Sequence, residues 1–431
     1  MDRVVRVGLL GCGVVGGATA RILMQNRSEI ARRAGAEVEL ARVAVRSLSK
    51  ERSVDLPDDL LTTDPSDVVS DPSIDIVVEA IGGIEPARDL ILEALRAKKH
   101  VVTANKELLA TLGREVMEEA EKNEVDLLFE ASVGGGIPVI RPIKESLVGD
   151  RVTRVMGIVN GTTNFILTRM SERGVSFAEA LAEADDLGYT ELDPASDIEG
   201  FDAASKLAIL ASIAFNGRVV TGDVHREGIS HVSKQDIAAA HELGYEVKLL
   251  AVAERDGEQI SARVHPAMLP RTHPLAAVRD VFNAIFVEGE EVGELMFLGR
   301  GAGGGPTGSA VVGDVVEIAR NLVTGGRSPG CTCYHDRASI KPLDDAHARY
   351  YIVLSVADQP GVLSKVAGVF GERGISIASV RQEGRGDEAS LILITHLGTE
   401  GMHRKTLTDL AELDVVKAIE SRMRVEGTEE Q

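Results

Sequence analysis

The residues best suited to chemistry lie in the segment 184–206. Asp202 and Lys206 stand four apart, so in a helix they share one face. Such a pair is usually an exposed ion pair that contributes little to stability. Residues 207–215, however, are apolar on nearly every side, which predicts a buried helix. Two buried charges need a ligand or a catalytic role.

Ser196 and Glu199 have the spacing of a capping box, which predicts that this helix begins close to Asp197. Gly200 would then lie inside the helix and weaken it. We therefore expect Gly200 to have a specific purpose, such as the close approach of a ligand.

A glycine pattern near the N-terminus is typical of dinucleotide binding. Gly11, Gly13 and Gly16 follow a strand expected at residues 4–10 and open a helix expected at 14–24. The first glycine permits a tight turn, the second lets the backbone approach a pyrophosphate, and the third lets the helix pack on the sheet. The alternative is a purely structural turn. The cofactor-binding residues expected here are Gly11, Cys12, Gly13, Val14, Val15 and Gly16.

The end of the second strand distinguishes the two nicotinamide dinucleotides. An acid there would bind the ribose hydroxyl of NAD, and an arginine would bind the 2′-phosphate of NADP. The strand ends at Arg46 with Lys50 nearby, whereas Glu37 and Glu39 stand at its beginning. We therefore expect NADP, although some enzymes of this kind also use NAD. The alternative is that Arg46 is only a solvated loop charge.

Thr103 and Lys106 follow a later strand, at the edge where open α/β sheets bind ligands. Lys106 is a candidate contact for the nicotinamide region or for the substrate. The alternative is a lysine in the first turn of the next helix with no such contact.

Composition narrows the class of protein. A formal net charge of −20 argues against binding to nucleic acids or anionic membranes, which need a basic surface. No apolar run approaches the roughly 20 residues of a membrane span. The N-terminus does not resemble a signal peptide, so we expect a cytoplasmic protein.

The three cysteines are Cys12, Cys331 and Cys333. They are too few for a disulfide framework, which fits a reducing compartment. A zinc site at Cys331 and Cys333 has little support, because no second ligand pair lies nearby.

The spacing of strands and helices predicts an α/β fold of three domains. Short β-branched runs alternate with helices, as in a Rossmann-type doubly wound parallel sheet; the runs are 4–10, 38–45, 74–80, 100–103 and 125–129. We expect this first domain at 1–133, completed by a returning helix at about 306–325. An α+β substrate-binding and dimerisation domain is expected at 134–305, with a hairpin turn at Asp256 and Gly257. After a linker at 326–348, residues 349–431 show the order β-α-β-β-α-β.

Several segments together resemble the homoserine dehydrogenase family. Residues 184–206 resemble the central motif of the family throughout, and 130–138, 160–164 and the loop around Gly303 resemble other parts of it. The match runs from about residue 5 to 325. Residues 358–363 and 374–377 resemble an ACT domain. No kinase-like segment precedes the first strand, so we expect a monofunctional arrangement without an attached aspartokinase.

The resemblance implies reduction of L-aspartate 4-semialdehyde to L-homoserine, a step of threonine, methionine and isoleucine biosynthesis. Lys206 would donate the proton to the forming alkoxide. Because the reverse oxidation needs a neutral lysine, and lysine ordinarily titrates near about pH 10.4, we expect an alkaline optimum for homoserine oxidation. The substrate-binding residues implied are Gly188, Glu191, Asp197, Asp202 and Lys106, and the further cofactor contacts are Thr103, Lys106 and Gly303.

The resemblance also implies two further ligands. Backbone carbonyls of Glu130, Val133, Gly135 and Ile137 would hold a monovalent cation such as sodium; the alternative is a glycine-rich bend. The ACT-like domain would bind an amino-acid effector, with threonine as the usual feedback inhibitor, or would serve only for dimerisation. We expect a homodimer or homotetramer.

Two alternatives remain open for the whole chain. One is another NADP-linked amino-acid or semialdehyde oxidoreductase, which would have to explain why Glu191, Asp202 and Lys206 occur together. The other is a catalytically silent sensor of NADP and an amino acid.

Overall fold

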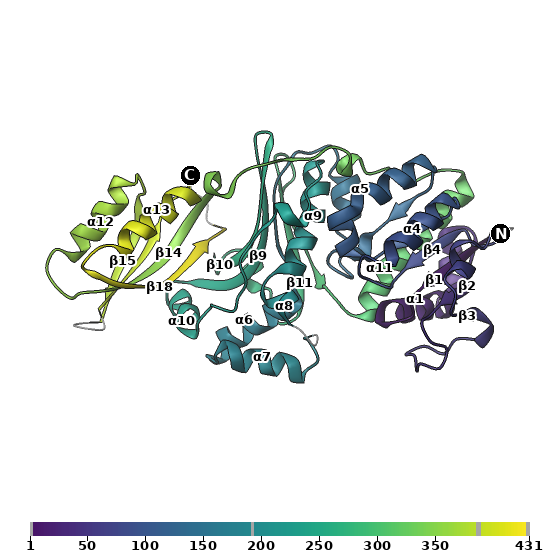
Figure 1. Ribbon diagram of the computed structural model, residues 1–431, viewed down its shortest axis with the longest axis horizontal. Helices are drawn as coiled ribbons and strands as arrows, with labels where there is room; N and C mark the ends of the chain where they lie inside the picture. The colour runs from purple at the N-terminus through teal and green to yellow at the C-terminus, as the bar shows by residue number, and fades with distance from the viewer. Residues whose placement is uncertain (1–2, 191–193, 385–388, 428–431) are drawn as a thin grey trace.

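Strands of the first 130 residues form a parallel sheet at one end of the molecule. The computed structural model describes residues 3–190, 194–384 and 389–427, and Figure 1 shows three parts in a row, with the N-terminal part at one end. The strands pair in the order β3-β2-β1-β4-β5-β6 and are all parallel, which confirms the doubly wound arrangement. Their bounds are β1 (Val4–Leu10), β2 (Glu37–Ala44), β3 (Leu61–Thr62), β4 (Ile76–Glu79), β5 (His100–Thr103) and β6 (Leu127–Leu128).

Helices cover this sheet, and one of them comes from much later in the chain. The local helices are α1 (Val14–Gln25), α2 (Arg27–Ala34), α3 (Ser66–Val69), α4 (Ala87–Arg96) and α5 (Lys106–Lys122). Helix α11 (Gly304–Thr324) packs against α1 and α2. Glycines permit this contact, because a Cβ at Gly304 would lie 2.8 Å from the Val14 carbonyl oxygen. The N-termini of α1 and α11 therefore lie close together.

The middle part is built on a long antiparallel sheet. Strands β12-β11-β7-β9-β10 are neighbours in that order, and the expected hairpin turn joins β9 to β10, with Gly257 at a φ of +60°. Helices α6 and α9 pack against the strands. The strands are β7 (Val152–Ile158), β8 (His225–Arg226), β9 (Tyr245–Asp256), β10 (Gln259–Pro270), β11 (Phe282–Gly289) and β12 (Gly293–Arg300). The helices are α6 (Gly161–Arg173), α7 (Phe177–Asp186), α8 (Ala195–Ile198), α9 (Phe201–Phe215) and α10 (Lys234–Glu242).

The C-terminal part has the expected β-α-β-β-α-β order and continues the same sheet. Strand β18 pairs with β10 of the middle part, and β18-β14-β16-β15 follow in that order. The bounds are β14 (His347–Val356), α12 (Val362–Glu372), β15 (Ile377–Glu383), β16 (Ser390–Thr395), β17 (Gly398–Thr399), α13 (Glu400–Ala411) and β18 (Val416–Val425). The shared sheet fixes this part against the middle part.

The start of the buried helix differs from the prediction. Ser196 lies inside the short helix α8 and makes no capping hydrogen bond, and α9 begins only at Phe201. Gly200 separates the two helices because its φ of +78° is left-handed, a conformation that glycine adopts without strain. The capping-box prediction is therefore wrong, and the purpose of Gly200 is to turn the chain between two helices.

The segment between α11 and β14 is held against the protein along its length. Tyr334 is buried, and a Cβ at Gly113 of α5 would lie 2.4 Å from its ring. Strand β13 (Ser339–Ile340) pairs with β10. These residues connect two parts of the molecule as a packed strap.

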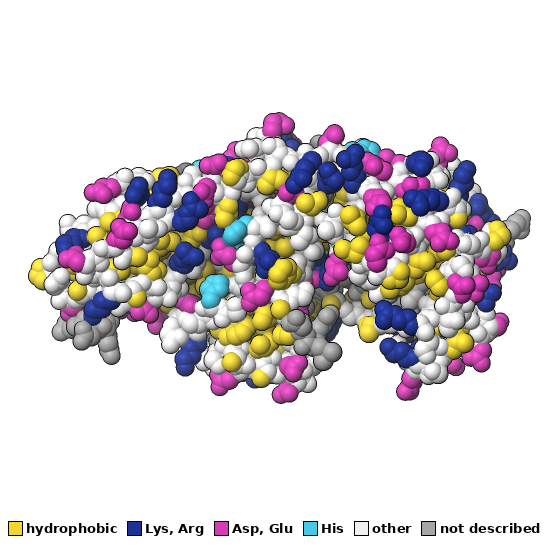
Figure 2. Space-filling model, viewed as in Figure 1, with side chains coloured by type: hydrophobic (Ala, Val, Ile, Leu, Met, Phe, Trp, Pro, Cys, Tyr) yellow, Lys and Arg dark blue, Asp and Glu magenta, His cyan; other side chains and the backbone are white. Residues whose placement is uncertain are grey.

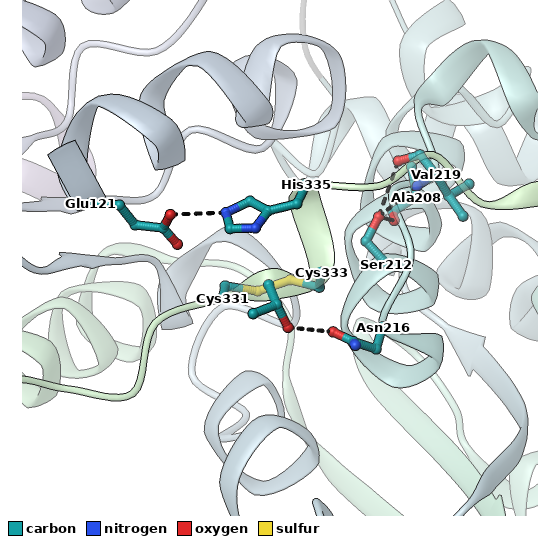
Figure 3. The surroundings of a disulfide bond; sticks show 9 residues. Glu121, Ala208, Ser212, Asn216, Val219, Cys331, Cys333 and His335 are labelled. Atoms are coloured by element: carbon teal, nitrogen blue, oxygen red, sulfur yellow. Dashed lines mark hydrogen bonds and ion pairs between the residues drawn. A yellow bond between two sulfur atoms is a disulfide. The ribbon is translucent and has the colours of Figure 1, made fainter.

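Cys331 and Cys333 form a disulfide within this strap (Figure 3). The sequence did not predict this disulfide. Three cysteines are too few for a framework of several disulfides, but that count does not argue against a single local bond. The intervening Thr332 donates a hydrogen bond of 2.8 Å to Asn216 at the end of α9. His335 pairs with Glu121 of α5 at 2.9 Å. The strap thus joins the C-terminal ends of α5 and α9.

The surface of the described residues mixes charges of both signs. On the face in Figure 2, Lys and Arg side chains are interleaved with Asp and Glu side chains. Within the described ranges, no helix is long and apolar enough to cross a membrane.

Candidate active site

Asp202 and Lys206 form a buried ion pair on α9. Lys206 Nζ donates to Asp202 Oδ2 at 2.7 Å and to the Val159 carbonyl oxygen at 2.7 Å. The two side chains are only 5% and 11% exposed, so the pair is not a solvated surface contact. Burial follows from the apolar sequence of α9, whose other faces pack against α5 and the middle sheet.

Lys106 joins this pair from the other part of the molecule. It is the first residue of α5, and its Nζ donates a hydrogen bond to Asp202 Oδ1. Asn105 caps α5 by accepting from the backbone N–H of Leu108, which sets the direction of the first turn. Lys106 is therefore both a first-turn lysine and a partner of Asp202.

Asn160 also belongs to the cluster, although the sequence assigned it no role. Its Nδ2 donates to Asp197 Oδ1 at 2.6 Å and to Asp202 Oδ2 at 2.9 Å. Its Oδ1 accepts from the backbone N–H of Thr163 and so caps α6. An asparagine at a helix N-cap is a common pattern, and only the fold reveals that its amide also faces two carboxylates.

The charges of the cluster shift one another's pKa values. Burial would raise the pKa of Asp202, but Lys206 and Lys106 outweigh burial and hold it well below its ordinary value. Burial lowers the pKa of Lys206, against the attraction of Asp202. Burial would also lower the pKa of Lys106, but Asp202 outweighs it and raises that pKa. Of the two lysines, Lys206 is the one poised to lose its proton.

Of the other predicted substrate residues, Asp197 belongs to this cluster, Gly188 lies beside α6, and Glu191 falls outside the described residues. Gly188 has a φ of +71° at the end of α7, and the next residue, Tyr189, accepts a hydrogen bond from Thr162 of α6. Asp197 is held by Asn160, as described. Glu191 lies in the segment that the structure does not describe.

The glycine turn after β1 has the geometry expected of a nucleotide cradle. Gly11 has a φ of +93°, and a Cβ at Gly16 would lie 2.1 Å from the Gly11 carbonyl oxygen. A Cβ at Gly13 would meet no atom within 4 Å. Gly11 and Gly16 are thus required by the protein itself, whereas Gly13 leaves room for a ligand beside the N-terminus of α1. Cys12, Val14 and Val15 complete this turn.

A cavity of about 440 Å³ opens beside the glycine turn. Arg46 and Lys50 line it, and so do Ser47 and Arg52, which the sequence reasoning missed. Arg52 donates hydrogen bonds to the carbonyl oxygens of Leu48 and Lys50 at 3.1 and 2.9 Å and so shapes the loop. Burial raises the pKa of the Cys12 thiol, and the charge of Arg52 opposes this shift.

Glu37 and Glu39 are engaged elsewhere. Glu37 pairs with Arg27, and Glu39 lies 3.9 Å from Arg6, both at the beginning of β2. The cavity therefore has basic residues and no carboxylate among those that line it. This donor set fits the 2′-phosphate of NADP.

Glu79 connects the cradle to the lysine cluster. It is buried at the end of β4, where its Oε1 accepts from the backbone N–H groups of Ile81 and Gly82. Its Oε2 accepts from Thr103 at the end of β5, at 2.6 Å. Since Ile81 lines the cavity and Lys106 follows Thr103, the cavity and the cluster share one edge of the sheet.

Gly303 and the segment 130–137 lie where α11 meets the two domains. Gly303 caps α11 with a φ of +109°. The carboxylate of Glu130 accepts from the backbone N–H groups of residues 139–141 at 2.6–2.9 Å, so it is already bound. Val133, Gly135 and Ile137 are buried in the same bend.

A nucleotide cradle and a buried lysine cluster at one edge of a parallel sheet are the construction of a nicotinamide-dependent oxidoreductase. Family models agree. Residues 11–130 match the NAD-binding domain of homoserine dehydrogenase, residues 138–316 match the homoserine dehydrogenase family, and residues 350–415 match the ACT domain.

Individual proteins also match over their full length. A homoserine dehydrogenase of Mycobacterium tuberculosis is 50% identical, with 99% of each chain covered. The crystal structure of a homoserine dehydrogenase from Thiobacillus denitrificans superposes with a TM-score of 0.93 at 42% identity, covering 98% of each chain. A hyperthermophilic archaeal homoserine dehydrogenase in complex with NADPH has a TM-score of 0.64 at 28% identity, covering 76% of this chain and 100% of that one.

The chain belongs to the homoserine dehydrogenase family. It is an oxidoreductase that acts on a CH–OH group, with a nicotinamide nucleotide as cofactor and an ACT domain at its C-terminal end. The family favours this activity over the two alternatives that the sequence left open.

Proposed function

We propose that Lys206 is the acid–base group of the reaction and that Asp202 and Lys106 position it. The contact of Lys106 with Asp202 carries this proposal, because it joins the cofactor-binding part to the buried helix α9. An ammonium has three N–H donors. Lys206 donates two of these N–H groups to Asp202 and to the Val159 carbonyl oxygen, so one N–H group is left for the substrate.

The residues of the cluster have different roles during reduction. NADPH, when bound, supplies the hydride. Lys206 donates its proton to the oxygen of the former aldehyde as negative charge develops there. Asp202 stays ionised and keeps Lys206 in place, while Asn160 fixes Asp202 and Asp197. Asp197 and Gly188 line the substrate pocket. Asp202, together with Glu191, is assigned to the amino end and the hydroxyl of the substrate, as the family resemblance implies.

NADP is the preferred cofactor in this proposal. Arg46, with Lys50 and Ser47, binds the 2′-phosphate, and Arg52 holds the loop in shape. Gly13 at the N-terminus of α1 and Gly303 at the N-terminus of α11 would hold the nucleotide phosphates. Thr103 and Lys106 lie at the nicotinamide end.

A monovalent cation, sodium in the first instance, is held by the backbone carbonyls of Glu130, Val133, Gly135 and Ile137. The family resemblance implies these carbonyl ligands. The structure supports them in that the bend is buried and the Glu130 carboxylate is already bound to backbone N–H groups. Turnover should therefore be lower in choline chloride than in sodium chloride at equal ionic strength. Equal turnover in the two salts would remove the cation from the proposal.

Feedback inhibition by threonine through the ACT domain completes the proposal, in a cytoplasmic homodimer or homotetramer. The test of the whole is a spectrophotometric assay of homoserine oxidation with NADP and with NAD, each with and without L-threonine. We expect turnover that prefers NADP and falls on adding threonine. The mass of the assembly follows from light scattering after size exclusion.

A further inference from the structure

A buried lysine of the middle part lies outside the catalytic cluster. Lys248 of β9 is 3% exposed, and its Nζ donates hydrogen bonds to Asn164 Oδ1 at 3.1 Å and to the carbonyl oxygen of Val278. Among the residues that the structure describes, no carboxylate pairs with this ammonium. Burying an ammonium without a charged partner costs free energy, so we expect Lys248 to have a specific role.

Lys248 fixes the side chain of Asn164 on α6. The Nδ2 of Asn164 donates to the carbonyl oxygens of Asp280 and Phe282 at 2.9 and 3.2 Å. An ammonium can only donate and a carbonyl can only accept, so one orientation of the amide satisfies both sides. Lys248 therefore sets the orientation in which Asn164 binds these two carbonyl groups.

The segment 278–282 has a backbone conformation that needs support. Asp280 has a φ of +54°, which is left-handed and uncommon for a residue other than glycine. Its backbone N–H donates to Thr168 of α6 at 3.2 Å, and its carboxylate pairs with Arg169 at 3.0 Å. These two side chains, together with Asn164, hold the segment against α6.

The segment in turn touches the first turn of α6. A Cβ at Gly161 would lie 3.0 Å from the Val281 carbonyl oxygen, so the two backbones meet there at close range. Asn160 precedes Gly161, and its amide binds the carboxylates of Asp197 and Asp202. A shift of the segment would therefore displace Asn160 from the two carboxylates that it holds.

We propose that Lys248 is a positioning residue for the dehydrogenase reaction and acts through Asn164 and the segment 278–282 on the amide of Asn160. Its hydrogen bonds go to Asn164 and Val278 and to no described member of the catalytic cluster. The inference rests on the proposed role of that cluster and extends its support to β9. The competing interpretation is a buried lysine that contributes only to stability.

The positioning role is tested with Lys248→Met, which keeps the length of the side chain and removes its N–H donors. Reduction of L-aspartate 4-semialdehyde is measured at about pH 7, because burial lowers the pKa of Lys248 to about 8 and the ammonium must be present. We expect kcat to fall by about tenfold, while the dissociation constant of NADPH changes by less than about twofold. A kcat equal to that of wild type would overturn the inference.

Lys99→Met is the matched control for the loss of a buried lysine. Lys99 is also 3% exposed, and its Nζ donates to the carbonyl oxygens of Asp71 and Ile74 in the cofactor-binding part. We expect Lys99→Met to lower the melting temperature, as Lys248→Met does, and to leave kcat within about twofold of wild type. An equal fall of kcat in both variants would mean that lost stability explains the effect, and the positioning role would be wrong.

A double-mutant cycle with Asn160→Ser tests the path. Serine is a good N-cap residue, so this variant keeps the start of α6 and loses only the amide that donates to the two carboxylates. If Lys248 acts through Asn160, Lys248→Met should lower kcat by less than about twofold in the Asn160→Ser background. A full additional fall of kcat in that background would overturn the path.

Lys248→Gln takes the place of Lys248→Met in each comparison where the methionine variant does not fold. Its amide keeps an N–H donor on a shorter side chain, so we expect a smaller fall of kcat, about two- to fivefold, with the same dependence on Asn160. A wild-type kcat in Lys248→Gln, or a fall that persists in full in the Asn160→Ser background, would count against the inference in the same way.

These outcomes are distinct from failure of the proposed function. If Asn160→Ser lowers kcat and Lys248→Met does not, the catalytic cluster stands and the inference fails. If Asn160→Ser keeps the kcat of wild type, the proposed role of Asn160 fails and the inference fails with it, while the acid–base role of Lys206 is decided by its own substitution.

Discussion

Lys206 Nζ lies 2.7 Å from Oδ2 of Asp202, which precedes it by one turn on the same helix. Lys106 contacts the other oxygen of that carboxylate. One carboxylate therefore fixes two lysines from two domains. Since Asp202 is buried, its removal would leave both ammonium groups without their shared partner. The geometry of the candidate active site depends on this one side chain.

Replacing Lys206 by methionine should abolish most turnover while leaving the cofactor bound. General acid–base groups typically contribute about 10²–10⁴ in rate, so kcat should fall by about that factor in both directions. The dissociation constant of NADPH, measured by fluorescence, should change by less than about twofold because the cradle is formed by other elements. Lys234→Met, at an exposed lysine of α10, is the matched control. A Lys206→Met enzyme with more than about a tenth of wild-type kcat would exclude the acid–base role.

The pH dependence of homoserine oxidation should report the Lys206 ammonium. Oxidation needs the neutral amine, so kcat should rise with pH and level off above the pKa of Lys206, which burial places below the ordinary lysine value. Asp202→Asn removes the attraction that opposes burial, so the rising limb should move to lower pH. The measurement is kcat against pH for both enzymes. A limb that moves upward in Asp202→Asn would contradict the assignment.

The sequence predicted those parts of the site that depend on local pattern. The apolar residues after Lys206 predicted its burial, and the spacing of Gly11, Gly13 and Gly16 predicted the turn that the structure contains. Both follow from periodicity and from the steric properties of glycine.

The remaining parts depend on contacts between residues far apart in the chain. Asn160 and Asp202 are 42 positions apart, and Lys106 and Asp202 are 96 apart, so no local pattern links them. The start of α9 was mispredicted because the capping-box spacing says nothing of the left-handed turn at Gly200, which separates α8 from α9.

Two alanine substitutions in the glycine turn should separate folding from cofactor binding. A Cβ at Gly16 would lie 2.1 Å from the Gly11 carbonyl oxygen, so Gly16→Ala should lower both the melting temperature and the affinity for NADPH. A Cβ at Gly13 meets no atom of the protein, so Gly13→Ala should keep the melting temperature within about 2 °C and still weaken NADPH binding. Thermal unfolding and NADPH titration are the two readouts. Full affinity in Gly13→Ala would place the phosphates elsewhere.

Arg46→Ala should change the choice of cofactor. Loss of a charge-assisted contact to the 2′-phosphate should raise the KM for NADP by about 10- to 100-fold. The KM for NAD, which lacks that phosphate, should stay within about twofold, and it serves as the internal control. An equal rise for both cofactors would mean that Arg46 supports the loop and does not read the phosphate.

Glu426 should stabilise the contact between the ACT domain and the middle part. Its buried carboxylate, at the end of β18, binds Arg263 of β10 at 2.9 Å and faces His265 at 3.4 Å, and it also pairs with Arg154 of β7. Removing one partner of a buried ion pair leaves the other charges uncompensated, at a cost of about 3–5 kcal/mol. Glu426→Gln should therefore lower the midpoint of urea unfolding.

The control for Glu426→Gln is Glu420→Gln, at an exposed position of the same strand. It removes the same charge without uncovering a buried cation, so its unfolding midpoint should match that of wild type. Equal midpoints for Glu426→Gln and Glu420→Gln would mean that backbone pairing of β10 with β18 holds the domains together and that the buried charges contribute little.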